Sequence, residues 1–130
     1  MICYVKTIHS HTIAEIFKRN VQLEASIAAG SICQLEYGYL TNKLDSTLPK
    51  YLVIEDKKSD DGKKQLDCIR LVPGMVLKGT HDIDPESVRV GVSCTFTTDL
   101  DDRFTVITTG GNDAELLDID AQTVTILINK

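Results

Sequence analysis

The stretch that decides the fold is Leu66-Asp67-Cys68-Ile69-Arg70-Leu71-Val72-Pro73-Gly74-Met75-Val76-Leu77-Lys78. Apolar residues take one phase of a two-residue alternation as far as Cys68, and they take the opposite phase from Ile69 onward. Because successive side chains of a strand point to opposite faces, this change of phase predicts either a bulge or a strand buried on both faces. Pro73-Gly74 is a turn signal, so residues 66–79 are expected to form two strands.

The same two-residue alternation recurs along the chain. β-branched residues fill these runs, and they suit a pleated, half-buried surface better than a helix. The runs are Tyr51–Glu55, Val92–Thr97, Phe104–Ile107 and Val124–Ile128. Turn signals separate them at Asp60-Asp61-Gly62, Leu100–Arg103 and Gly110–Asp113. We therefore expect an all-β protein, either a compact β-barrel or a β-sandwich of short antiparallel strands.

The beginning of the chain is less regular. A helical spacing of apolar residues starts there but is not sustained, so we interpret Ala14–Phe17 and Val21–Leu23 as strands. Residues 1–12 are expected to form an extended N-terminal arm or, alternatively, a first strand. No repeat or linker divides the remainder, so residues 13–130 are predicted to be a single β domain.

Composition narrows the classes of partner. The chain has 130 residues and a net charge of −5, with a pI of about 5.1. An acidic chain disfavours nucleic-acid binding, because phosphate backbones attract basic surfaces. No apolar run approaches the roughly 18 residues of a membrane span, and the first residues lack the basic start and apolar core of a signal peptide. We expect no nucleic-acid or membrane partner and a chain that stays in a cytoplasm.

The cysteines do not indicate a metal or redox site. Cys3, Cys33, Cys68 and Cys94 are widely separated, and no two of them form a Cys-x-x-Cys pair. Each lies in an apolar, strand-like segment, so we predict buried free thiols. The alternative is a disulfide or a crosslink within a lattice. No metal or other cofactor is predicted.

Signatures of catalysis are absent from the sequence, which contains no Gly-x-Ser-x-Gly, phosphate-binding glycine loop or His-Glu-x-x-His. His9 and His11 would share a face of an extended segment and could chelate a metal, but no third ligand follows nearby. We interpret them as exposed residues of the arm. His81 fits a loop, and the clustered aspartates fit turns. We predict that the protein is not an enzyme, and a site assembled from distant residues is left open.

Two lysine pairs frame a turn signal. Lys57-Lys58 and Lys63-Lys64 lie on either side of Ser59-Asp60-Asp61-Gly62. A solvated hairpin tip explains this pattern. The alternative is a protruding loop that contacts a partner lattice or a host, because binding residues are often placed on loops. Lys57, Lys58, Lys63 and Lys64 are therefore candidate partner-binding residues.

The order of these elements resembles that of small proteins encoded beside the major capsid gene of tailed bacteriophages, the head decoration or capsid-associated structural proteins. The resemblance is distributed over several segments after residue 14. They are Glu15–Phe17, Ser26–Leu35, Leu48–Glu55, Leu66–Lys78, Val90–Ser93 and Val124–Ile128. The cysteines and the long connection Glu36–Leu48 depart from the pattern of that group. The resemblance brings no catalytic residue with it.

The resemblance implies a virion structural protein that binds the outer surface of a phage capsid and stabilises the shell. Its partner would be the major capsid protein, and it would assemble in the host cytoplasm as a homo-oligomer, for which a trimer is one arrangement. Repeated binding sites on a shell would supply avidity. The alternatives are a neck, tail or head-fibre component of the virion, or a cellular β-barrel that acts as a binding module.

In such a protein the N-terminal arm would be the natural docking element. Ile2, Tyr4 and Val5 are apolar and could lie along the sheet edge of a neighbour as an added strand. His9 and His11 would belong to the same contact. The alternative for this segment is the first strand of the domain's own sheet.

Overall fold

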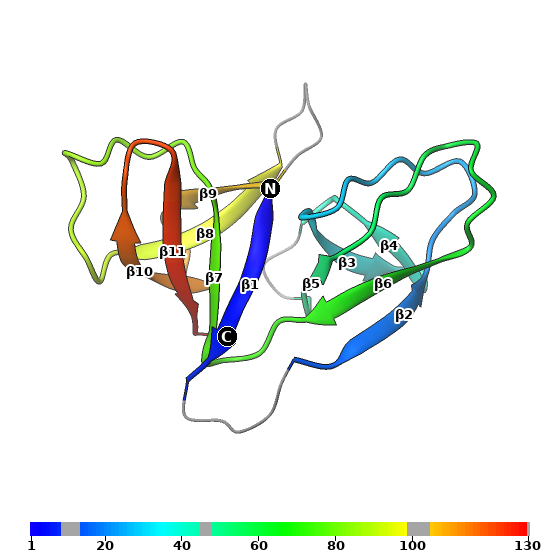
Figure 1. Ribbon diagram of the computed structural model, residues 1–130, viewed down its shortest axis with the longest axis horizontal. Coiled ribbons are helices and arrows are strands. Elements are labelled where there is room, and N and C mark those ends of the chain that lie inside the picture. The colour runs from blue at the N-terminus through cyan, green and yellow to red at the C-terminus, as the bar shows by residue number, and fades with distance from the viewer. Residues whose placement is uncertain (9–13, 45–47, 99–104, 130) are drawn as a thin grey trace.

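The computed structural model describes residues 1–8, 14–44, 48–98 and 105–129. These residues contain eleven strands and no helix, and Figure 1 shows the strands as two groups side by side. The strands are β1 (Ile2–Thr7), β2 (Ile16–Asn20), β3 (Ile32–Glu36), β4 (Tyr39–Thr41), β5 (Tyr51–Val53), β6 (Gln65–Arg70), β7 (Met75–Thr80), β8 (Ser93–Thr98), β9 (Thr105–Thr109), β10 (Ala114–Ile119) and β11 (Thr123–Ile128).

The strands form two antiparallel sheets that pack together as a β-sandwich, which confirms the predicted fold class. The first sheet has the order β1-β7-β11-β10-β8-β9, and the second has the order β2-β6-β5-β3-β4. The first sheet also curls on itself, because His81, just after β7, forms a parallel bridge with Ile107 of β9. Sharply twisted sheets of short strands curl in this way.

The main core lies between the two sheets. Its buried side chains come from both, including Leu77 and Ile126 of the first sheet and Ile32, Leu52 and Ile69 of the second. Burying each such side chain stabilises the fold by about 1.5–3 kcal/mol. The apolar contact between the sheets therefore holds the sandwich together.

A second core cluster covers the far face of the second sheet, away from the first sheet. It includes Cys33, Val53 and Leu66, and the segment after β2 closes it with Val21 and Ile27. The second sheet is thus buried on both faces.

Strand β6 supplies both cores. Leu66 and Cys68 belong to the far-face cluster, whereas Ile69, and Leu71 directly after the strand, belong to the main core. The change of phase between Cys68 and Ile69 is therefore the mark of a strand buried on both faces, which is one of the two predicted readings.

Polar bonds also join the sheets. The backbone N–H of Ile32 at the start of β3 donates to Thr105 Oγ1 of β9 over 2.8 Å, and Thr105 is buried. Lys50, just before β5, forms a buried ion pair with Asp113, just before β10, at 3.5 Å. These contacts link the two sheets in addition to the apolar core.

Residues 2–7 form β1, the alternative in which the N-terminal segment is a first strand. β1 pairs with β7, and the N–H of Ile2 donates to the carbonyl of Gly30 over 3.0 Å. A Cβ on Gly30 would lie 2.2 Å from Met1 Cγ, and one on Gly79 would lie 2.7 Å from Ile2 Cγ1. β1 is therefore clasped between β7 and the loop before β3, as its place between the two groups in Figure 1 shows.

Three local predictions differ from the structure. One strand, β2 at Ile16–Asn20, replaces the two that were expected at Ala14–Phe17 and Val21–Leu23. Within β2, the guanidinium carbon of Arg19 lies 4.9 Å from the ring centroid of Phe17 and 5.4 Å from that of Tyr51. That cation–π contact keeps a charged residue on an inner face. The strands β4 and β10 were not predicted.

Candidate binding groove

The connection between β3 and β4 is a two-residue hairpin. Glu36 pairs with Tyr39, which leaves Tyr37 and Gly38 as the turn. Their φ angles are 52° and 84°, and two consecutive positive φ angles are what a type I′ hairpin turn requires. The long connection expected at Glu36–Leu48 therefore begins with a tight hairpin.

Tyr37 is an unusual choice for this turn. It is the only residue other than glycine with a positive φ among those the structure describes. Asn, Asp or Gly normally fills this position, because other side chains lose roughly 1 kcal/mol in the left-handed region. The Tyr37 side chain is 94% exposed, so packing within the domain does not offset that strain.

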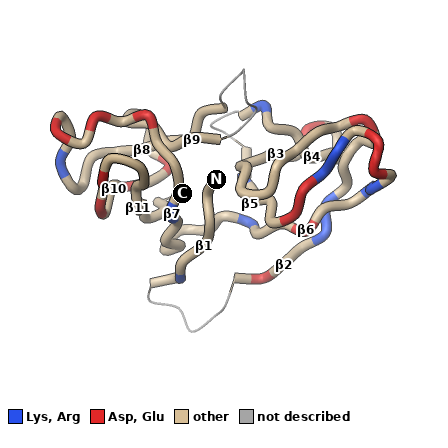
Figure 2. Tube along the Cα trace, turned by 45° about the horizontal axis from the view of Figure 1, so that its top comes forward, with Lys and Arg blue, Asp and Glu red and all other residues tan. Residues whose placement is uncertain are grey.

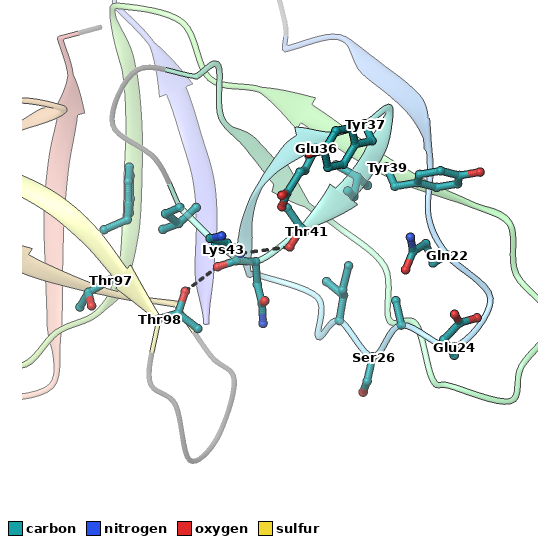
Figure 3. A pocket seen from close by; sticks show the side chains of 16 residues that line it. Gln22, Glu24, Ser26, Glu36, Tyr37, Tyr39, Thr41, Lys43, Thr97 and Thr98 are labelled. Carbon is teal, nitrogen blue, oxygen red and sulfur yellow. Dashed lines mark hydrogen bonds between the residues drawn. The ribbon is translucent and has the colours of Figure 1, made fainter.

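The hairpin forms one wall of an open groove of about 860 Å³. Tyr37 and Tyr39 line it from the hairpin, and Tyr39 is 43% exposed. The segment from Gln22 to Ile27 provides a second wall, and the end of β8 with Thr97 and Thr98 provides the third. Figure 3 shows these walls converging from three separate segments of the chain.

The floor and far end of the groove are fixed by hydrogen bonds. Thr98 Oγ1 of the first sheet donates to the carbonyl of Asn42 over 2.9 Å, and the N–H of Lys43 donates to Thr41 Oγ1 over 3.3 Å (Figure 3). Leu40 is buried in the far-face cluster beneath the hairpin. The groove therefore bridges the two sheets and has a rigid base.

Four polar side chains in the groove walls have no hydrogen-bonding partner within the described residues. The side chains of Gln22, Glu24, Ser26 and Glu36 form no hydrogen bond or ion pair with another residue in the described part of the chain. Together they present amide, hydroxyl and carboxylate groups to the groove. The described lining contains no histidine or cysteine, so its chemistry favours binding over acid–base or nucleophilic catalysis.

Lys57 is the clearest correction among the predicted site residues. It was expected on a solvated loop tip, but its side chain is fully buried. Its Nζ donates to the carbonyls of Leu23 and Lys58 at 2.7 and 2.6 Å and pairs with Asp61 Oδ1 at 2.9 Å. A buried ammonium needs such partners, and here it ties together the two loops that cover the second sheet. It is not available to a partner.

Asp61 completes this arrangement. Its carboxylate accepts the backbone N–H of Lys58 at 2.8 Å and of Lys63 at 2.9 Å. These backbone bonds, followed by the Lys57 ammonium, hold the pKa of the Asp61 carboxyl well below its usual range. The aspartate predicted as a solvated turn residue thus organises the whole loop.

The other lysines of this loop are exposed, as a solvated tip requires. Lys63 Nζ lies 3.6 Å from Glu55 Oε2 and donates to the carbonyl of Asp56 over 2.8 Å. Lys58 and Lys64 are exposed in the same loop. Whether any of the three contacts a partner stays a prediction.

The predicted residues of the N-terminal segment have different environments. Ile2 is only 2% exposed and lies in the main core, so it is not available to a partner as the arm hypothesis required. Tyr4 is partly buried, with its hydroxyl 2.6 Å from Thr7 Oγ1. Val5 is 49% exposed at a β-bulge of the edge strand β1. His9 and His11 lie outside the described residues.

The structure does not bring these candidate residues into one site. β1 belongs to the first sheet, whereas Lys57–Lys64 connect β5 to β6 of the second. The groove residues were not predicted, because tyrosine is not a usual turn residue and the β3–β4 hairpin was therefore not recognised in the sequence. A two-residue spacer ending in glycine, between Leu35-Glu36 and Tyr39-Leu40, was the signal that could have found it.

The cysteines are free, and three of them are buried as predicted. Burial raises the pKa of the Cys33 thiol to about 12 and that of Cys68 to about 11, and it also raises the pKa of Cys94. These thiols stay protonated and are poor nucleophiles. Cys3 is exposed, so the prediction of burial is wrong for that residue, which lies on the edge strand β1.

His81 has a structural environment. Its Nδ1 accepts the backbone N–H of Ile83 at 3.0 Å, and its Nε2 lies 2.8 Å from the carbonyl of Asp120. Both ring nitrogens are therefore used to join the loop after β7 to the β10–β11 turn. Among the described residues, no three His, Cys, Asp or Glu side chains gather as a metal site.

Comparisons with known proteins do not assign the chain to a family. No family model, no curated protein and no solved structure matches it. Within the described residues there is no helix long and apolar enough to cross a membrane.

Proposed function

We propose that this protein is a non-catalytic structural component of a phage virion. It binds the outer surface of the capsid through the major capsid protein and stabilises the shell. It acts as a homo-oligomer, for which a trimer is one arrangement.

One observation supports the non-catalytic part of this proposal. The groups best suited to chemistry are used to hold loops and sheets together. Both His81 nitrogens bond to backbone groups, Lys57 is enclosed by two carbonyls and Asp61, and Asp113 contacts Lys50 and Thr95 Oγ1. In the described structure these groups satisfy backbone and ionic partners of the domain itself. Such an interior suits a rigid body that binds another surface.

The capsid part of the proposal rests on the order of strands and turns that resembles the capsid-associated proteins. The charge distribution agrees with it. Figure 2 shows acidic residues spread over the half of the molecule that contains β8 and β10, and mixed charges over the half that contains β2 and β6. An acidic body would not compete for the DNA that is packaged during assembly.

Strand β1 offers the most direct contact surface. It is an edge strand of the first sheet, and its Val5 is 49% exposed. Because Ile2 anchors the same strand in the core, the edge is rigid before any partner arrives. A preformed edge lowers the entropic cost of binding.

The test is co-sedimentation of the purified protein with capsids that lack it, followed by imaging of the loaded shells. We expect repeated density on the outer surface. We also expect Val5→Asp to weaken binding at least tenfold, because it places a charge in an apolar contact. Val90→Asp is the matched control, since Val90 is 69% exposed in the loop before β8, and it should bind like the wild type.

The outcomes separate the hypotheses. Density only at the neck or tail would replace the capsid surface with another place in the virion. No association of the wild-type protein with any part of the particle would overturn the virion function. Equal binding by the Val5→Asp variant would overturn only the assignment of β1 as the contact.

A second candidate function is supported by the groove. Uncommitted polar groups that converge on a concave surface are typical of a binding module. This candidate does not depend on a virion, and the groove is where its ligand would be found.

A further inference from the structure

We propose that the groove beside the β3–β4 hairpin binds a short uncharged oligosaccharide. The geometry that points to it is the placement of two exposed tyrosines, Tyr37 and Tyr39, on the rim of a groove whose other walls present uncommitted polar side chains. This inference goes beyond the proposed capsid contact, which uses a different surface.

The tyrosines supply the apolar part of such a site. The faces of sugar rings that carry C–H bonds pack against the electron-rich face of an aromatic ring. Tyrosine also gives a large contact area at a small cost in side-chain entropy. Tyr39 projects from the start of β4 and Tyr37 from the turn, so the two rings stand on one rigid hairpin (Figure 3).

The backbone at Tyr37 points to a role for its side chain. Asn or Gly would form the same turn with less strain. A strained residue that gains no packing inside the domain is typical of functional sites. The 94% exposure of Tyr37 places its ring where only an external molecule can contact it.

The opposite wall supplies hydrogen bonds. Gln22 offers an amide that both donates and accepts, Ser26 a hydroxyl, and Glu24 a carboxylate that accepts. Glu36 adds a second carboxylate on the hairpin side. Sugar hydroxyls both donate and accept, so they can satisfy all of these groups, and each is without a partner in the described structure.

Charge and polarity exclude other classes of ligand. The lining contains two carboxylates, those of Glu24 and Glu36, and a single lysine, Lys43, so the groove disfavours phosphates and acidic sugars. A purely apolar ligand would leave the polar walls desolvated without partners. The volume of about 860 Å³ falls within the range of small-ligand sites, which suits a short oligosaccharide.

The experiment is a printed array of neutral and anionic oligosaccharides probed with the labelled protein. Isothermal titration with the neutral trisaccharide that gives the strongest signal then measures affinity. We expect binding to neutral sugars. Tyr39→Ala should reduce the affinity at least tenfold, because stacking on an aromatic ring is the main apolar contact.

A second variant separates binding from folding. Tyr37→Asn removes the ring but places a residue that prefers a positive φ at the turn. Its affinity should fall about as far as that of Tyr39→Ala, while its melting temperature stays equal to the wild type or rises. A merely structural role for Tyr37 would give the opposite result, a lower melting temperature with unchanged affinity.

Val90→Ala is the control, because Val90 is exposed but lies outside the groove lining. Several results would overturn the proposal: no neutral sugar bound above background, binding restricted to anionic sugars, or affinity that neither tyrosine variant changes. Capture of an extended peptide by the groove in place of sugars would overturn it as well. None of these results depends on whether the protein binds capsids.

Discussion

Two loops of the second sheet reverse the roles that their sequences indicate. The loop between β5 and β6 is rich in lysine and aspartate, which predicts a solvated tip or, alternatively, a contact loop, yet Lys57 is buried and Asp61 accepts backbone N–H groups of its own loop. The segment after β3 was expected to be part of one long connection, Glu36–Leu48, yet it holds Tyr37 in a strained turn with its ring in solvent.

The difference shows what decides the role of a loop residue. A loop that covers a core cluster must satisfy its own backbone groups, and its charged residues are recruited for that task. A tight hairpin already satisfies its backbone through the pairing of Glu36 with Tyr39. Its side chains are therefore free for contacts with other molecules.

The largest expected effect comes from removing the buried charge. Lys57→Met keeps the side-chain length but leaves the carbonyls of Leu23 and Lys58 without their donor and Asp61 without its ammonium. We expect the free energy of unfolding to fall by about 3 kcal/mol. Denaturant unfolding followed by circular dichroism measures it.

Lys58→Met is the matched control at the neighbouring, exposed position, and it should stay within about 0.5 kcal/mol of the wild type. If Lys57→Met also stayed within about 0.5 kcal/mol of the wild type, the lysine-rich loop would behave as a solvated tip after all. The contrast with the hairpin would then disappear.

The next expected effect depends on pH. Backbone N–H bonds and the Lys57 ammonium lower the pKa of Asp61 in the folded protein. A group whose pKa is lower when folded adds stability above its unfolded pKa, and that stability is lost as pH falls toward the folded pKa. The ordinary value is 3.8, so the contribution should be complete at pH 5–7 and decline below about pH 4.

Asp61→Asn tests this directly. The variant should melt at a lower temperature than the wild type, by a margin that is constant from pH 7 to pH 5. The margin should shrink as the pH drops below 4, because Asp61 then becomes protonated in the unfolded wild-type chain, and this favours unfolding of the wild type but not of the variant. A margin that grew on acidification would contradict the sign of the pKa shift.

The sequence predicted an all-β fold, either a barrel or a sandwich, but it did not predict the groove beside the β3–β4 hairpin, and the reasons are physical. The alternation of residues 66–79 reports burial on both faces, since a strand's period is fixed by its backbone. The burial of Lys57 was not predicted, because a single buried charged residue does not alter the two-residue alternation of apolar residues along a strand. Its burial depends on carbonyls from Leu23 and Lys58, which only the folded chain brings together.

The groove could not be predicted for a related reason. Its walls come from Gln22–Ile27, the β3–β4 hairpin and the end of β8, and these segments share no motif. The register of β2 was also missed, because Arg19 looks like an outward residue until the rings of Phe17 and Tyr51 are placed beneath it. Pairwise contacts of this kind carry no signal in one sequence.

The smallest expected effect compares the two turns through their glycines. Gly62 has a φ of 74° and Gly38 a φ of 84°, and a Cβ added at either would meet no atom within 4 Å. Gly62→Ala and Gly38→Ala should therefore each cost about 1 kcal/mol, the strain of alanine in the left-handed region. Thermal unfolding of the two variants side by side measures the costs.

Equal costs would mean that the two loops place the same conformational requirement on the backbone and differ only in their side chains. A cost at Gly62 larger by more than about 1 kcal/mol would show that the network of Lys57 and Asp61 also fixes the backbone of its loop, so that the contrast between the loops extends to the main chain.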